Sequence, residues 1–149
     1  MKKPNLEQEA KSVHWMAYFK MIEVSGRLED VLKTTLQPFD LTHPQLNILY
    51  LLARHHPDPL NAQDLKEGLI TGHPDITRLV DRMVQKGFVY RVTCEDNRRK
   101  VDIGITEKGM QIFVKAHHSG RDMVQKRFDA HLTESEAKQL FKLLGKIKP

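Results

Sequence analysis

The chain has 149 residues, 40% of them hydrophobic, enough for one domain with a hydrophobic core and too few for two domains of ordinary size. Its net charge of +5 is compatible with a polyanionic partner, although many proteins are equally basic. The single cysteine, Cys94, excludes an internal disulfide framework, and no apolar run approaches the roughly 20 residues that span a bilayer. We therefore expect a cytoplasmic protein without a membrane partner.

The chain is expected to begin with a long amphipathic helix over residues 13–36, which Pro38 would end. Its apolar stripe recurs at helical spacing and consists of Val13, Met16, Ala17, Met21, Val24, Leu28, Val31 and Leu32. A second helix, over residues 44–55, follows a cap at Thr42 or His43.

Three short elements follow. Residues 60–61 are typical of a short strand, residues 62–69 of a short helix, and residues 70–73 of a turn that contains Gly72. The next helix spans about residues 74–86. Its predicted core stripe is Ile76, Leu79, Val80, Met83 and Val84. Its opposite face carries Thr77, Arg78, Asp81, Arg82 and Gln85. Two helices joined by a turn of a few residues predict a helix-turn-helix.

A β-hairpin is predicted next. Residues 88–94 are rich in β-branched and aromatic side chains, and residues 100–105 alternate apolar and polar side chains. Between them, residues 95–99 form a turn flanked by cations. A helix-turn-helix followed by a hairpin is a winged helix-turn-helix, so the predicted class is mainly α with a small β-wing.

Two helices are expected after the hairpin. Thr106 is placed to cap a helix that runs to about Phe128, and Thr133 and Glu136 form a capping-box pattern before the last helix. The apolar face of the last helix consists of Ala137, Leu140, Phe141, Leu144 and Ile147. Such a face packs either within the chain or against a second copy.

At these positions the sequence resembles the MarR family of bacterial transcriptional regulators. The resemblance is carried by Ile76-Thr77-Arg78, Met83-x-x-x-Gly87-Phe88-Val89-x-Arg91, Asp96-x-Arg98-Arg99 and Ile105-Thr106-x-x-Gly109, and more weakly by Leu41-Thr42-x-x-Gln45-x-x-x-Leu49. It implies one domain over residues 1–149, in which residues 41–106 form the winged helix-turn-helix. Residues 1–37 and 107–149 would then supply the helices that dimerise.

The resemblance also implies a repressor that binds a pseudo-palindromic operator in double-stranded DNA as a homodimer. A helix in the major groove contacts bases with residues near its N-terminus, which here are Thr77 and Arg78, with His73 and Arg82 beside them. On the preceding helix, candidate phosphate contacts are Gln63 and Lys66.

The hairpin supplies a second set of candidates. Arg98 would enter the adjacent minor groove, Asp96 would orient it, and Arg99 and Lys100 would contact phosphates. The alternative is that Asp96 and Arg98 form only a turn-stabilising ion pair. We expect Arg98→Ala to weaken operator binding at least about tenfold without unfolding the protein.

Asp75 departs from what a DNA-binding helix needs. Its charge favours the helix dipole but repels phosphate unless it accepts a proton from cytosine N4. This residue keeps open a second interpretation, a winged-helix module that binds protein or RNA.

The remaining signals concern small molecules. The family resemblance implies a small aromatic or acidic effector, and the aromatic side chains that this chain offers for it are His14, Trp15, Tyr18, Phe19, Tyr50, Phe113 and His117. Each of these is equally typical of a core position. Cys94 leaves open a redox-responsive regulator. The eight histidines lack metal-ligand spacing, and no catalytic motif occurs, so neither metal, cofactor nor enzymatic activity is expected.

Overall fold

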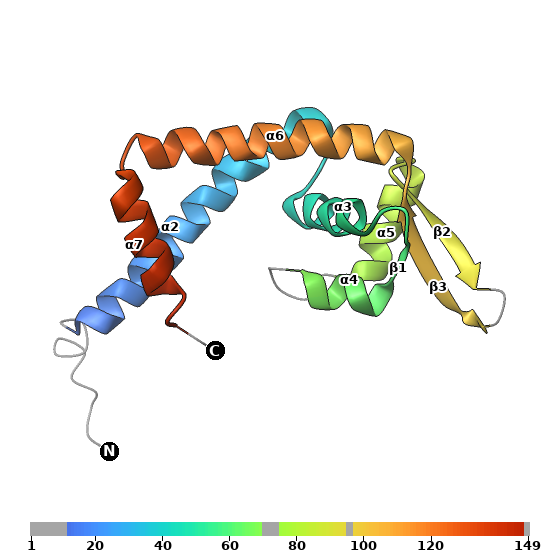
Figure 1. The fold of residues 1–149 in the computed structure, drawn as a ribbon, viewed down its shortest axis with the longest axis horizontal. Helices are drawn as coiled ribbons and strands as arrows, with labels where there is room; N and C mark the ends of the chain where they lie inside the picture. Colours follow the sequence, from blue (N-terminus) through green and yellow to red (C-terminus); the bar gives the residue numbers. More distant parts are fainter. Residues whose placement is uncertain (1–11, 70–74, 95–96, 148–149) are drawn as a thin grey trace, which may run out of the picture. The chain divides into compact units, whose positions relative to one another are not determined.

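The computed structural model describes residues 12–69, 75–94 and 97–147 (Figure 1). It divides into two compact units, Met1–Thr34 and Thr35–Pro149. The first unit is represented by helix α2 (Val13–Leu36), whose final residues enter the second unit. Most of the apolar side chains of α2 are exposed, including Val13 at 75% and Met16 at 59%.

The second unit is a small sheet with helices. In chain order it contains η1 (Gln37–Phe39), α3 (His43–His55), β1 (Leu60–Asn61), α4 (Ala62–Gly68), α5 (Ile76–Gln85), β2 (Val89–Cys94), β3 (Asn97–Ile105), α6 (Glu107–Asp129) and α7 (Glu134–Leu144). The antiparallel sheet has the order β1-β3-β2, with Leu60 opposite Ile103 and Val89 opposite Ile105. In Figure 1, α4 and α5 lie beside the β2–β3 hairpin, the arrangement of a winged helix.

Side-chain caps fix where most of these helices begin. Thr42, rather than His43, caps α3, and it forms a capping box with Gln45. The predicted box of Thr133 and Glu136 is present at α7. There the Thr133 backbone N–H donates to the Glu136 carboxylate, which lowers the pKa of that side chain and keeps it charged.

The core of the second unit joins the first helices to the sheet. Its fully buried side chains are Leu36, Ile48, Leu49, Leu52, Leu65, Met83 and Val80. Phe88, Ile103 and Ile105 extend this core along the sheet. Helix α3 contributes three of these seven fully buried side chains, more than any other element, and it contacts α4, α5, α6 and β3.

The predicted helices and strands are present, with two corrections, and the turn predicted at residues 70–73 lies outside the described residues. Val84 was placed on the core stripe of α5, but it is 36% exposed. At about 100° per residue, a position eight residues after Ile76 lies about 80° around the helix, at the edge of the buried stripe. The second strand of the hairpin is also longer than predicted, because β3 begins at Asn97, within the range predicted as turn.

Candidate nucleic-acid interface

One face of α5 is free of the core. Thr77, Arg78 and Arg82 are exposed, whereas Ile76 and Val80 beside them are buried. On α4, Gln63 and Lys66 are also exposed, and the Gln63 amide donates to Glu67 at 2.7 Å. The structure therefore presents the α4 and α5 candidates to solvent, as a nucleic-acid interface requires.

Several residues predicted to contact DNA have side chains that the structure does not describe. Arg98, Arg99 and Lys100 lie on β3 next to the hairpin turn, but their side chains are outside the description. His73 and Asp96 lie outside the described residues altogether. The predicted pairing of Asp96 with Arg98 stays a prediction.

Asp75 has a local partner. Its carboxylate caps α5 by accepting from the Arg78 backbone N–H at 3.2 Å, and its other oxygen lies 3.2 Å from Arg78 Nε. The charge that the sequence placed in the first turn is thus at the N-cap and paired with a cation. A paired carboxylate repels phosphate less than a free one.

A second ion pair joins α5 to the hairpin. Asp81 Oδ1 accepts from Arg91 on β2 at 2.6 Å, and both side chains are partly buried. Together with Thr77 and Val101, the pair lines a cavity of about 380 Å³ between helix and sheet. The pair thus links α5 to β2 beside this cavity.

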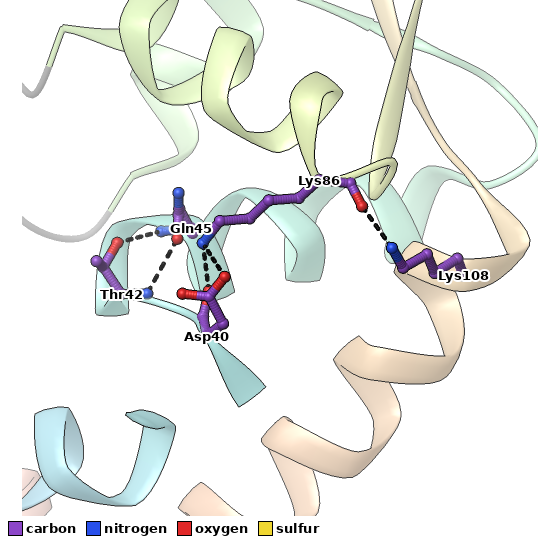
Figure 2. Close-up of polar contacts among 5 residues, drawn as sticks. All are labelled: Asp40, Thr42, Gln45, Lys86 and Lys108. Carbon is purple, nitrogen blue, oxygen red and sulfur yellow. Dashed lines mark hydrogen bonds and ion pairs between the residues drawn. The ribbon is translucent and has the colours of Figure 1, made fainter. Parts of the chain in front are cut away.

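Lys86, at the C-terminal end of α5, holds a third set of contacts (Figure 2). The Lys86 ammonium group lies 2.5 Å from the backbone carbonyl oxygen of Asp40 and 2.9 Å from the Asp40 carboxylate. Asp40 comes just before the capping box of Thr42 and Gln45. The Lys86 carbonyl accepts from Lys108 Nζ of α6 at 2.7 Å. The end of α5 is thereby tied to the start of both α3 and α6.

The Thr-x-x-Gly motif attaches the wing to α6. The Thr106 hydroxyl accepts from the Gly109 backbone N–H at 2.9 Å and lies 2.7 Å from the Gly87 carbonyl, to which it donates. A Cβ on Gly109 would lie 1.9 Å from the Phe88 carbonyl oxygen, so the close approach requires glycine. Gly87 itself has φ 73°, which ends α5 and turns the chain into β2.

The effector candidates form two aromatic groups, one in each unit. In α2, Trp15 contacts Tyr18 and Phe19, with ring centroids 5.6 and 4.8 Å away. In the second unit, Tyr50 of α3 stacks on His117 of α6 at 6.1 Å. Phe113 completes this second group, 5.3 Å from His117. His14 is exposed on α2.

The described residues hold no group of three or more His, Cys, Asp or Glu side chains placed to bind a metal. Within the same part of the chain, no helix is long and apolar enough to cross a bilayer.

The sequence interpretation did not identify Lys86, Arg91 or Lys108 as positioning residues. A signal for one of them was present: Asp81 and Arg91 are opposite charges on either side of the helix-ending Gly87, ten positions apart. Lys86 and Asp40 are 46 positions apart, and no local pattern relates them.

An exposed polar helix face, a helix capped and tied at both ends, and a hairpin beside it define a winged-helix DNA-binding protein. Residues 41–101 match the model of the MarR family. The chain is 30% identical over 125 residues to YfiV of Bacillus subtilis, an uncharacterised HTH-type transcriptional regulator, and the match covers 84% of this chain and 74% of that protein. It therefore belongs to the MarR family and is a DNA-binding transcriptional regulator.

Solved structures agree with this assignment. The chain is similar to MepR of Staphylococcus aureus in a complex with DNA, with 26% identity, a TM-score of 0.75, and coverage of 87% of this chain and 93% of that one. It is also similar to a MarR variant from Escherichia coli complexed with operator DNA, with 26% identity, a TM-score of 0.76, and coverage of 92% and 95%.

Proposed function

We propose that the protein is a cytoplasmic repressor that binds a pseudo-palindromic operator as a homodimer. The observation that carries the proposal is the exposed face of α5, with Thr77, Arg78 and Arg82 on one side of a helix whose other side is buried. Placed in the major groove, this face brings Thr77 and Arg78 to base edges at the N-terminal end of the helix.

Polar and charged side chains around α5 complete the proposed interface. Lys66 on α4 contacts phosphate, as do Gln63, Arg99 and Lys100. In this proposal Arg98 enters the minor groove and is oriented by Asp96, and His73 contacts the duplex beside Thr77 and Arg78. MepR and the MarR variant, both solved with DNA, support DNA as the partner of this interface.

Dimerisation follows from the outer helices. On α7, Phe141 is 83% exposed and Leu143 is 50% exposed, and α2 exposes a comparable stripe. Apolar faces of this extent favour burial against a second copy. Residues 1–37 and 107–149 would then form the dimerisation region around the winged helix of residues 41–106.

We place effector binding at the aromatic group of Tyr50, Phe113 and His117. Asn47 lies one turn before Tyr50 on α3, and its buried amide nitrogen has no hydrogen-bond partner among the described residues. An acceptor on a small aromatic acid would satisfy this donor while its ring packs on Tyr50. His14, Trp15, Tyr18 and Phe19 of α2 are further candidates. A regulator from the structural comparison is solved with 2,4-dichlorophenol bound, which supports an aromatic effector.

The test is selection of duplexes from random sequence, followed by fluorescence anisotropy with bulk DNA as competitor. The proposal predicts a two-fold symmetric preferred sequence, and a log-log plot of affinity against salt concentration with a slope of about −0.9 per phosphate contact. Lys66→Ala should make the slope shallower by about 1 without changing the sequence preference. A protein that prefers no duplex over bulk DNA would instead be the winged-helix interaction module.

A further inference from the structure

We infer that Asp75 is a positioning residue that orients Arg78 for recognition of one base pair. The inference rests on the proposed function, because it concerns the same face of α5. It goes beyond that function by assigning to the acidic residue a share of sequence specificity rather than a repulsive charge.

The carboxylate of Asp75 is itself held in place. One oxygen accepts from the Arg78 backbone N–H at 3.2 Å as the N-cap of α5. This bond fixes the carboxylate at the end of the helix and leaves its second oxygen beside the Arg78 side chain. The N-cap thus serves as a rigid support for a long, otherwise free side chain.

The second oxygen contacts one particular atom of Arg78. Oδ2 forms its ion pair with Nε, 3.2 Å away, rather than with one of the two terminal nitrogens. A guanidinium held through Nε can still present its terminal N–H groups as a pair. Guanine offers O6 and N7 in the major groove as a matching pair of acceptors.

Exposure sets the size of the effect. Arg78 is 82% exposed and Asp75 is 56% exposed, so each is accessible to DNA and the pair is solvated in the free protein. An exposed ion pair favours its bonded geometry by at most about fivefold. Loss of the support should therefore reduce discrimination at one base pair by about three- to fivefold.

Asp75→Asn is the informative variant, because asparagine is as good an N-cap as aspartate. It keeps an oxygen for the Arg78 N–H and removes the charge that holds Nε. The helix should therefore stay capped, with an unchanged melting temperature. Asp75→Ala, which removes both contacts, is the comparison that also reports the contribution of the cap.

The experiment uses the operator selected by the wild-type protein and a set of duplexes, each with one base pair changed. Competition anisotropy gives the discrimination at every position for wild type, Asp75→Asn, Arg78→Ala and the double variant. We expect Arg78→Ala to remove discrimination at one base pair per half-site. Asp75→Asn should reduce discrimination about three- to fivefold at that same base pair, while binding to bulk DNA becomes tighter.

In the double variant, Asp75→Asn should change nothing further at that base pair. Equal tightening on all duplexes, with discrimination intact, would show that Asp75 only repels phosphate and would overturn the inference. A changed preference at another base pair that persists without Arg78 would also overturn it, because Asp75 would then contact a base directly. If the wild type selects no operator, the proposed function itself fails, so the two failures are distinguishable.

Discussion

Helices α3 and α7 both begin with a threonine capping box, yet one is buried and the other is exposed. Helix α3 buries Gln45, Leu46, Ile48, Leu49 and Leu52, whereas α7 buries none of its residues and leaves Phe141 83% exposed. The apolar face of α3 therefore packs within the chain, whereas the apolar face of α7, the outer helix, stays exposed. The winged helix therefore buries its core within one copy, whereas the exposed apolar face of α7 is free for the proposed contact with a second copy.

The largest effect is expected from breaking the contact made by the outer helix. Phe141→Asp should convert the dimer to a monomer and weaken operator binding at least about 100-fold, because the second half-site no longer adds to the affinity. Light scattering gives the oligomeric state and anisotropy the affinity. Gln139→Asp places the same charge at an exposed polar position of α7 and should change neither. A dimeric Phe141→Asp variant would refute the role of α7.

Substitution of one glycine at the junction of wing and α6, and of another on α2, compares how much the packing of each region contributes to stability. Gly109→Ala places a methyl group against the Phe88 carbonyl and should lower the free energy of unfolding by about 3 kcal/mol. Gly26→Ala, on α2, has nothing within 4 Å of the new Cβ and should raise it by up to about 1 kcal/mol through helix propensity. Denaturant unfolding measures both variants. A tolerated Gly109→Ala would mean that the junction of wing and α6 is looser than described.

The ends of the helices show which structural features the sequence determines locally. Gly87 and the capping box of Thr133 and Glu136 were recognised because a helix end depends on a few adjacent residues. The place of Val84 was wrong because helical periodicity defines a stripe but not its edges, which depend on neighbouring elements. The local signals therefore predicted the elements well and their limits less well.

Local signals alone do not give the contacts that position α5. Lys86 meets Asp40 only after α3 and α5 have packed, and Asp81 meets Arg91 only after β2 has turned back beside the helix. The sequence placed Asp75 in the first turn of the helix, but its position as the N-cap and its pairing with Arg78 depend on the folded backbone and on rotamers. The sequence thus predicted which face of α5 is exposed, and it missed the contacts that hold this helix in place.

A substitution on that face should act on binding rather than stability. Because Arg78 is 82% exposed, Arg78→Ala should leave the melting temperature unchanged. Loss of a bidentate base contact should weaken binding to the selected operator by about tenfold and leave binding to bulk DNA nearly unchanged. Arg121→Ala, an exposed arginine on α6, is the matched control. Equal losses on operator and bulk DNA would assign Arg78 to phosphate.

The smallest effect concerns the spacing of α5 and the wing. In a double-mutant cycle of Asp81→Asn and Arg91→Gln, we expect a coupling of up to about 1 kcal/mol in operator affinity, because the pair is only partly buried. Anisotropy with operator DNA gives all four affinities. Additive effects of the two substitutions would show that the pair does not set the distance between helix and wing.

The most direct test of operator binding by a homodimer is to vary the distance between the two half-sites of the selected operator. Anisotropy would compare a single half-site, two half-sites with centres about 10 base pairs apart, and two half-sites displaced by half a turn. The account predicts tight binding only for the pair one turn apart. Equal affinity for the single half-site would contradict it, because one copy of the chain would then suffice.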